Sequence, residues 1–121
     1  MKTITYNIGV EATIDVIGGK WKPIILCHLK HGTKRTSELK RLMPSITQKM
    51  LTQQLRELEA DGVVTRIVYE QVPPKVEYSL SSYGQSLAPV LELLCLWGEK
   101  HIEQRVSLYK EDIVLENTEL T

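Results

Sequence analysis

The sequence predicts a mainly α-helical domain that carries one small β-hairpin. Apolar residues recur with helical spacing in the first half of the chain, alternate with polar residues over 63–80, and return to helical spacing from residue 82. The chain has 121 residues, which is the size of one domain. We therefore expect a single unit over 1–121, with a core over about 10–80, C-terminal helices over about 82–110 and a frayed acidic tail over 111–121.

The composition is that of an ordinary globular domain. Hydrophobic residues make up 42% of the chain and charged residues 25%, which argues against wholesale disorder. No apolar run approaches the roughly 18 residues that a membrane span needs, and the first residues lack a signal-peptide core. We therefore expect a cytoplasmic protein with no membrane partner. Its two cysteines, Cys27 and Cys95, are then expected to be reduced thiols rather than a disulfide framework.

The first two predicted helices are separated by a glycine pair. Val10, Ile14 and Ile17 share one helical face, and Gly18-Gly19 ends that helix. Pro23 fits the first turn of a second helix, which we expect to end at Gly32. The predicted buried face of this second helix consists of Ile24, Ile25, Cys27 and Leu29.

Two further helices flank a tight turn. Thr36 is expected to cap a short helix that ends before Pro44. Thr47 or Ser45 is expected to cap the next helix, which runs to about Asp61. The inward-facing residues are expected to be Leu39, Leu42 and Met43 in the shorter helix, and Leu51, Leu55 and Leu58 in the longer one.

A β-hairpin and a long helix complete the domain. Residues 63–69 and 76–80 are predicted strands, and Pro73-Pro74 place the turn between them, since paired prolines do not fit a central strand. Ser82 is then expected to cap the long helix. Two helices joined by a tight turn and followed by a hairpin make a winged helix-turn-helix, here with extra terminal helices.

Basic residues are concentrated in the helix-turn-helix part of the chain. The formal net charge is zero, but residues 1–80 carry 12 Lys and Arg against 8 Asp and Glu. Within residues 20–49 there are 8 basic residues and a single acidic one, Glu38. This distribution indicates a polyanionic partner, and with the predicted fold it points to double-stranded DNA.

The fourth helix has the polar side chains that reading a DNA major groove requires. Such a helix needs hydrogen-bond donors and acceptors on one exposed face near its N-terminus. The predicted base-reading residues are Gln48, Lys49, Thr52 and Gln53. The residues predicted to contact the DNA backbone, or to act from the wing, are Lys34, Arg35, Lys40, Arg41, Arg56 and Lys75.

The long helix carries more apolar surface than a small winged core needs, so we expect a homodimer. The predicted interface residues are Val10, Ile14, Ile17, Leu91, Leu94, Cys95, Trp97 and Ile102.

A cavity between the winged core and the long helix could hold a small-molecule effector. Two alternatives stay open: a ligand- or redox-responsive sensor that acts through Cys27 or Cys95, and a winged-helix protein-interaction module that does not bind DNA.

The sequence gives little support for catalysis or metal binding. Cys27, His28 and His31 lie close together on one predicted helix, but Cys27 belongs to its apolar face. No nucleophile has an adjacent base in the sequence. We therefore expect no enzymatic activity, no metal and no cofactor.

Several motifs resemble those of the HxlR-type winged-helix transcriptional regulators, which are relatives of the MarR group. They are DVIGGKWK at 15–22, LRELEADG at 55–62, VPPKVEYSL at 72–80, and the short sequences Pro89-Val90-Leu91 and Trp97-Gly98. The resemblance implies a bacterial transcription regulator that dimerises through its terminal helices and binds a (pseudo)palindromic operator. Many family members have Cys-Pro where this chain has Ile8-Gly9, which excludes thiol sensing at that position, and Thr36 stands where the family often has an aromatic residue.

Overall fold

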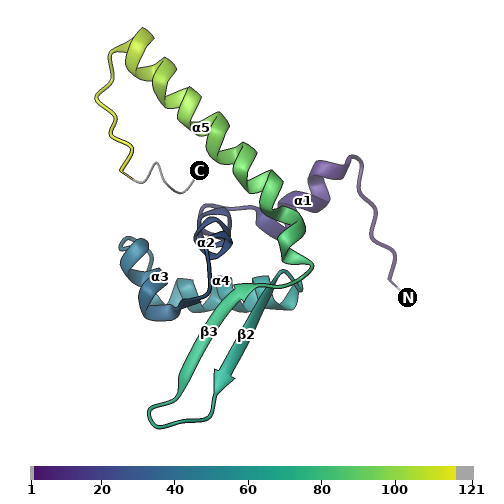
Figure 1. Cartoon of the computed structure of the whole chain (residues 1–121). Coiled ribbons are helices and arrows are strands. Elements are labelled where there is room, and N and C mark those ends of the chain that lie inside the picture. Colours follow the sequence, from purple (N-terminus) through teal and green to yellow (C-terminus); the bar gives the residue numbers. More distant parts are fainter. Residues whose placement is uncertain (1, 117–121) are drawn as a thin grey trace.

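The structure is a computed structural model that describes residues 2–116 of the chain. The predicted fold class is confirmed: the described chain is mostly helical and carries a small antiparallel sheet (Figure 1). The elements in order are α1 (Gly9–Ile17), α2 (Trp21–Lys30), β1 (Lys34–Arg35), α3 (Thr36–Leu42), α4 (Gln48–Ala60), β2 (Val64–Tyr69), β3 (Lys75–Leu80), a 3-10 turn η1 (Gly84–Leu87) and α5 (Ala88–Tyr109). None of the helices within residues 2–116 has the length and apolar character needed to cross a membrane.

The second helix is packed on more than one side. α2 contacts α4 and β3 on one side and α5 on the other, so its buried surface is wider than a single stripe. The predicted face was therefore partly wrong. Ile25 and Leu29 are buried as expected, but Leu26 is also buried and Ile24 is exposed.

The helix-turn-helix is formed by α3, the turn and α4. The backbone N–H of Arg35 donates to Glu38 Oε1 at 2.9 Å, so Arg35 is the N-cap of α3 and the expected cap, Thr36, is its first residue. The predicted cap of α4 is confirmed, because Thr47 Oγ1 accepts a hydrogen bond from the Met50 N–H at 3.1 Å. Met43 and Ile46 fix the turn in the core, whereas Leu42 is exposed rather than buried as expected.

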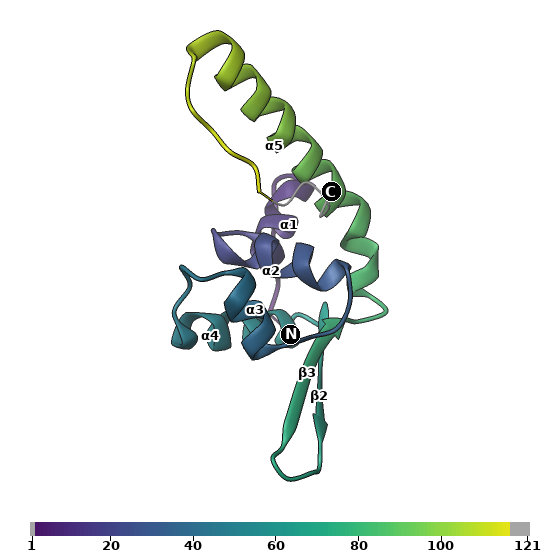
Figure 2. The same cartoon turned by 60° about the vertical axis from the view of Figure 1, so that its left-hand side comes forward.

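The sheet has three antiparallel strands in the order β1-β3-β2, one strand more than the predicted hairpin. β1 pairs with β3 through Lys34 opposite Tyr78 and Arg35 opposite Glu77. A two-residue strand has no readable periodicity, which explains why the sequence did not predict it. Only the base of the β2–β3 hairpin is buried, and the rest projects beyond the helices as a wing (Figures 1 and 2).

A close backbone contact joins the wing to the long helix. The Oγ of Ser81 accepts a hydrogen bond from the Gly84 N–H at 2.9 Å and so fixes the turn before α5. The N-caps of η1 and α5 are Tyr83 and Leu87, so the predicted cap, Ser82, is wrong. A Cβ at Gly84 would lie 2.0 Å from the carbonyl oxygen of Val63, so only glycine fits there. Beyond α5, residues 110–116 turn back toward α2 instead of extending away, and residues 117–121 of the expected tail lie outside the described part.

The core lies between α2, α3, α4 and the base of the sheet. Its fully buried side chains come from the three helices, the turn before α4, the residue before β2 and the first turn of α5: Ile25, Leu26, Leu39, Ile46, Leu51, Leu55, Leu58, Val63 and Leu91. The inward stripe predicted for the fourth helix is confirmed by the complete burial of its three leucines. This core holds α4 rigidly while leaving its opposite face outside.

Candidate nucleic-acid interface

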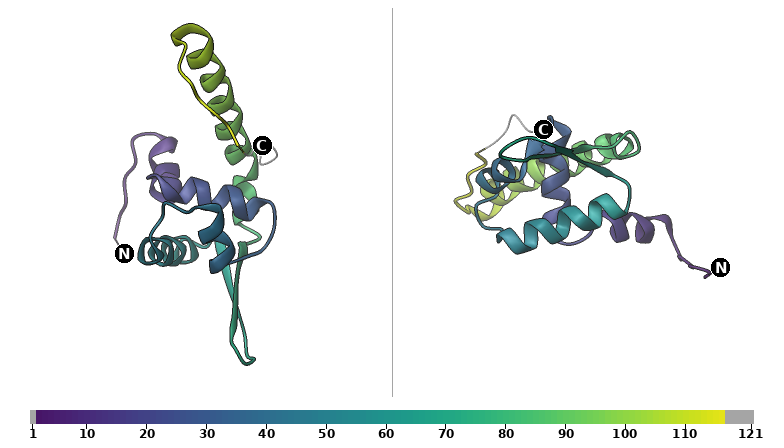
Figure 3. Two further views of the ribbon diagram at one scale, coloured as in Figure 1. Left: turned by 90° about the vertical axis from the view of Figure 1, so that its left-hand side faces the viewer. Right: turned by 90° about the horizontal axis from the view of Figure 1, so that it is seen from below.

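The fourth helix and the wing lie at one end of the molecule, and most of α5 projects from the other end (Figure 1). Seen from below, α4 and the hairpin are on the near side (Figure 3). Since the leucines of α4 face the core, its polar side chains are directed outward. One exposed helix beside a projecting hairpin is the arrangement with which winged helices enter DNA grooves.

The structure brings the four predicted base-reading residues together on the first two turns of α4. Gln48, Lys49 and Gln53 are exposed, and Thr52 is half-buried. The Nε2 of Gln48 lies 3.5 Å from the Thr52 hydroxyl, so these two side chains orient each other. No hydrogen bond or ion pair holds the side chains of Lys49 and Gln53 within residues 2–116. Both are therefore available to an external partner.

The basic residues predicted to contact the DNA backbone fall into two groups. Arg35, Arg41 and Arg56 are exposed. Lys34, Lys40 and Lys75 are half-buried and engaged with their own chain. The ammonium groups of Lys34 and Lys40 donate to the carbonyl oxygens of Gly32 (3.4 Å) and Pro44 (3.1 Å), respectively.

The wing lysine has two partners within the hairpin. The ammonium nitrogen of Lys75 lies 3.7 Å from a Glu77 carboxylate oxygen and 4.8 Å from the centre of the Tyr69 ring. A hydrogen bond to Glu77 also raises the pKa of the Tyr69 hydroxyl. The Glu77 carboxylate offsets part of the Lys75 charge, so Lys75 attracts a phosphate less strongly than a free lysine would.

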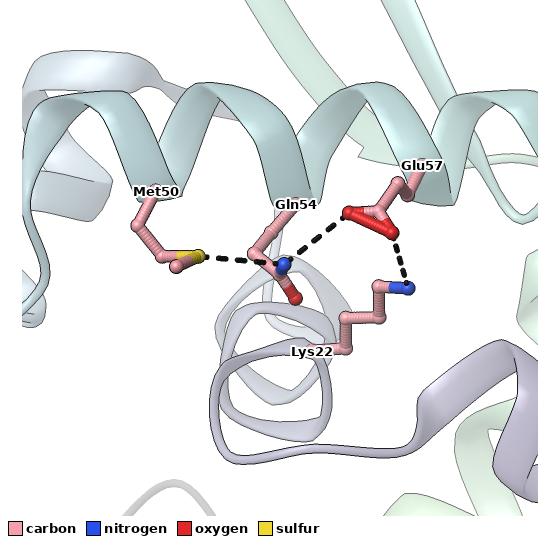
Figure 4. Close-up of polar contacts among 4 residues, drawn as sticks. All are labelled: Lys22, Met50, Gln54 and Glu57. Carbon is pink, nitrogen blue, oxygen red and sulfur yellow. Dashed lines mark hydrogen bonds and ion pairs between the residues drawn. The ribbon is translucent and has the colours of Figure 1, made fainter.

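One lysine of the basic region is buried. Lys22 is only 9% exposed, and its Nζ lies 3.4 Å from Glu57 Oε1 on α4. The Nε2 of Gln54 lies 3.3 Å from the other carboxylate oxygen and 3.5 Å from Met50 Sδ (Figure 4). Lys22 therefore holds α2 against α4 and offers no charge to DNA. The sequence does not predict this role, because nothing in the local sequence distinguishes Lys22 from its exposed neighbours.

The predicted dimer residues separate into an outward and an inward set. Val10, Ile14, Leu94 and Trp97 are exposed apolar side chains, and Trp97 is 69% exposed. Ile17 and Leu91 lie in the core of the single chain, where they leave almost no surface for a partner. Cys95 and Ile102 line a cavity beside α2, and so does part of the exposed Leu94.

Further exposed apolar residues, which were not among the predicted interface residues, accompany the outward set. They are Leu93, which is 66% exposed, and Ile4, Tyr6 and Ile8 before α1. Leu93 could have been found from its i, i+4 spacing to Trp97.

Burial shifts the pKa values of two neighbouring side chains on α2, Cys27 and His28. Burial is the main cause that raises the pKa of the Cys27 thiol to about 12, and the adjacent Cys95 adds to it. Burial also lowers the pKa of His28, as does the positive charge of Lys34, and the His28 Nδ1 has no hydrogen-bond partner within residues 2–116. Among those residues, no group of three His, Cys, Asp or Glu side chains is arranged to hold a metal ion.

This combination of a winged helix-turn-helix core and terminal helices defines the class of MarR-like winged-helix transcription regulators. The HxlR-like helix-turn-helix family model matches residues 16–106, and the chain belongs to this family. It is 73% identical over 104 residues to YtcD of Bacillus subtilis (strain 168), described as an uncharacterized HTH-type transcriptional regulator; the match covers 86% of this chain and 82% of YtcD.

Solved structures agree with this assignment. The crystal structure of YtcD matches with a TM-score of 0.76 over 79% of this chain and 98% of that chain. The redox regulator HypR in its oxidized form is 59% identical, with a TM-score of 0.75 over 77% of this chain and 96% of that chain. A MarR-family regulator from Enterococcus faecalis V583 is 39% identical, with a TM-score of 0.72 over 89% of this chain and 98% of that chain. The chain is therefore similar to transcription regulators over most of its length.

Proposed function

We propose that the protein is a non-enzymatic, cytoplasmic regulator that binds a (pseudo)palindromic DNA operator as a homodimer. The observation that carries this proposal is the outward face of α4. Two of its side chains, Lys49 and Gln53, are exposed and held by no hydrogen bond or ion pair within the described residues. A lysine donates to the acceptors of guanine, and a glutamine amide both donates to and accepts from adenine. The face therefore has the groups that distinguish base pairs.

The exposed arginines support the backbone contacts of this proposal. Arg41 on α3 and Arg56 on α4 are exposed, and Arg35 lies in β1 directly before α3. Arginines beside a reading helix bind phosphate oxygens, which fixes the position of the helix in the groove without reading sequence. We assign the larger share of backbone binding to these three arginines, because Lys40 and Lys75 are engaged within the chain.

The exposed apolar side chains of α1 and α5 support the dimer. α5 has 22 residues and is therefore about 33 Å long, and it leaves the core after its first turn. Leu93 and Trp97 lie one turn apart on it and are largely exposed. Apolar surface of this extent on a small domain marks an interface. Pairing through α1 and α5 would present two copies of α4 to successive half-sites about 34 Å apart.

Fluorescence anisotropy tests this proposal with a labelled duplex from the region upstream of the protein's own gene. The expected result is saturable binding of two chains per duplex, with affinity at least a thousandfold above that for a random duplex. Equal affinity for both duplexes would contradict operator recognition. No binding to either duplex at low salt would favour the protein-interaction alternative.

A further inference from the structure

A cavity of about 570 Å³ lies between α2, α5 and the C-terminal segment that turns back from α5. Figure 1 shows that segment, in yellow, returning from the far end of α5. The cavity is lined mainly by apolar side chains, among them Ile24, Leu94 and Ile102, and it also contains both cysteines of the chain. A small uncharged molecule can therefore reach two thiols in a largely apolar site.

The two thiols come from different helices and lie in contact. Cys27 Sγ on α2 is 3.7 Å from Cys95 Sγ on α5, and both cysteines are free and half-buried. A disulfide has an S–S distance of about 2.05 Å, so the sulfur atoms need to approach by about 1.6 Å. Rotation of the two side chains together with a small shift of α5 against α2 supplies a movement of this size.

We propose that Cys27 and Cys95 form a reversible intrachain disulfide when a hydroperoxide enters this cavity, and that the bond regulates DNA binding. The regulatory half of this inference rests on the proposed function; the disulfide itself does not. The redox site is distinct from position 8, where the chain has isoleucine instead of cysteine.

The reaction balances with a hydroperoxide as the only oxidant. The Cys95 thiolate attacks one peroxide oxygen, the O–O bond breaks, and an alcohol (or water, from hydrogen peroxide) leaves as Cys95 becomes a sulfenic acid. The Cys27 sulfur then attacks the Cys95 sulfur, the S–S bond forms, and the sulfenic oxygen leaves with the Cys27 proton as water. Overall the two thiols lose two electrons and two protons, and the hydroperoxide is reduced.

The environment of the Cys27 sulfur fits its place as the second thiol in this order. The raised pKa of Cys27 keeps its thiol protonated at neutral pH, so it is a poor first nucleophile. As the second thiol it needs only an intramolecular attack on a sulfur already beside it, where proximity compensates for a low thiolate fraction.

The disulfide would link α2, which is part of the winged helix-turn-helix core, to α5. α2 packs against α4 and is tied to it by the Lys22–Glu57 ion pair, while α5 carries the proposed dimer surface. A shift of α5 against α2 therefore changes the spacing between the two copies of α4 in a dimer. We expect operator affinity to fall about tenfold on oxidation, a typical size for coupling between two sites.

The test treats the reduced full-length protein with hydrogen peroxide or cumene hydroperoxide and measures intact mass, peptide linkage and operator binding. The expected product has lost two hydrogens, contains a Cys27–Cys95 peptide pair, binds the operator more weakly and recovers with dithiothreitol. The variants Cys27→Ser and Cys95→Ser should keep their operator affinity after the same treatment. Circular dichroism confirms that each variant is folded.

A folded protein that shows no linked peptide pair, or one that links cysteines between chains, overturns the site. A linked pair with unchanged operator affinity overturns its regulatory role. If the reduced protein binds no DNA, the proposed function and the regulatory role fail together, whereas the peptide linkage is still decided by mass.

Discussion

The Lys22–Glu57 ion pair ties α2 to α4 and contributes to the stability of the fold. Glu57→Gln removes the carboxylate that faces the Lys22 ammonium 3.4 Å away and leaves that buried charge without an ionic partner. At this distance Coulomb's law gives about 1.2 kcal/mol in bulk water and about 5 kcal/mol at an effective dielectric constant of 20. The Lys22 side chain is 11% exposed but that of Glu57 is 45% exposed, which places the pair between a surface and a buried one.

We therefore expect Glu57→Gln to lower the free energy of unfolding by about 2 kcal/mol, measured by equilibrium urea denaturation. The matched control is Glu59→Gln, an exposed glutamate on the same helix, which should change stability by less than about 0.5 kcal/mol. Lys22→Met in the Glu57→Gln background should recover most of the loss, because it removes the unpaired charge. The reasoning is refuted if Glu57→Gln lowers the free energy of unfolding no more than Glu59→Gln does. It is also refuted if the effects of Glu57→Gln and Lys22→Met on that free energy are strictly additive.

Three further predictions concern the reading face, the dimer and the buried histidine. Gln53→Ala should cost roughly 1–3 kcal/mol of discrimination at one operator base pair in competition binding, and unchanged discrimination would contradict its assigned role. Trp97→Ala should weaken dimerisation at least tenfold by analytical ultracentrifugation; an unchanged dimer would remove α5 from the interface. The lowered pKa of His28 means that its contribution to stability is present above pH 6.5 and lost as the pH falls below it. His28→Gln should therefore flatten the loss of stability between pH 7 and pH 5, while an equally flat profile for His31→Gln would show that the effect is not specific to His28.

Helical periodicity predicted the buried residues correctly where a helix packs against the core with one face. The leucine stripe of α4 follows the i, i+4, i+7 rule and is fully buried, because this helix lies on the core with one face. The same rule misplaced Ile24 and Leu26, since α2 is covered from two sides. An apolar periodicity identifies a single buried face, whereas a central helix such as α2 is buried on more than one face.

The sequence also predicted that Gln48, Lys49, Thr52 and Gln53 lie together, because they are within two turns of a single helix; that they read bases stays a prediction. It did not predict interactions between residues far apart in the chain. Lys22 and Glu57 are 35 residues apart, and Cys27 and Cys95 are 68 apart, so only tertiary packing brings them together. Long-range contacts of this kind decide which basic residues are free and which thiols meet.

The salt dependence of operator binding tests the central claim most directly. In the proposed complex, the exposed arginines Arg35, Arg41 and Arg56 contribute three backbone contacts per chain and hence six per dimer. The logarithm of the association constant should then fall against the logarithm of salt concentration with a slope of about −5. The variant Arg41→Ala should reduce the magnitude of that slope by about 2, one unit for each chain. A slope near zero, or a slope that Arg41→Ala leaves unchanged, would contradict the placement of DNA against α3, α4 and β1.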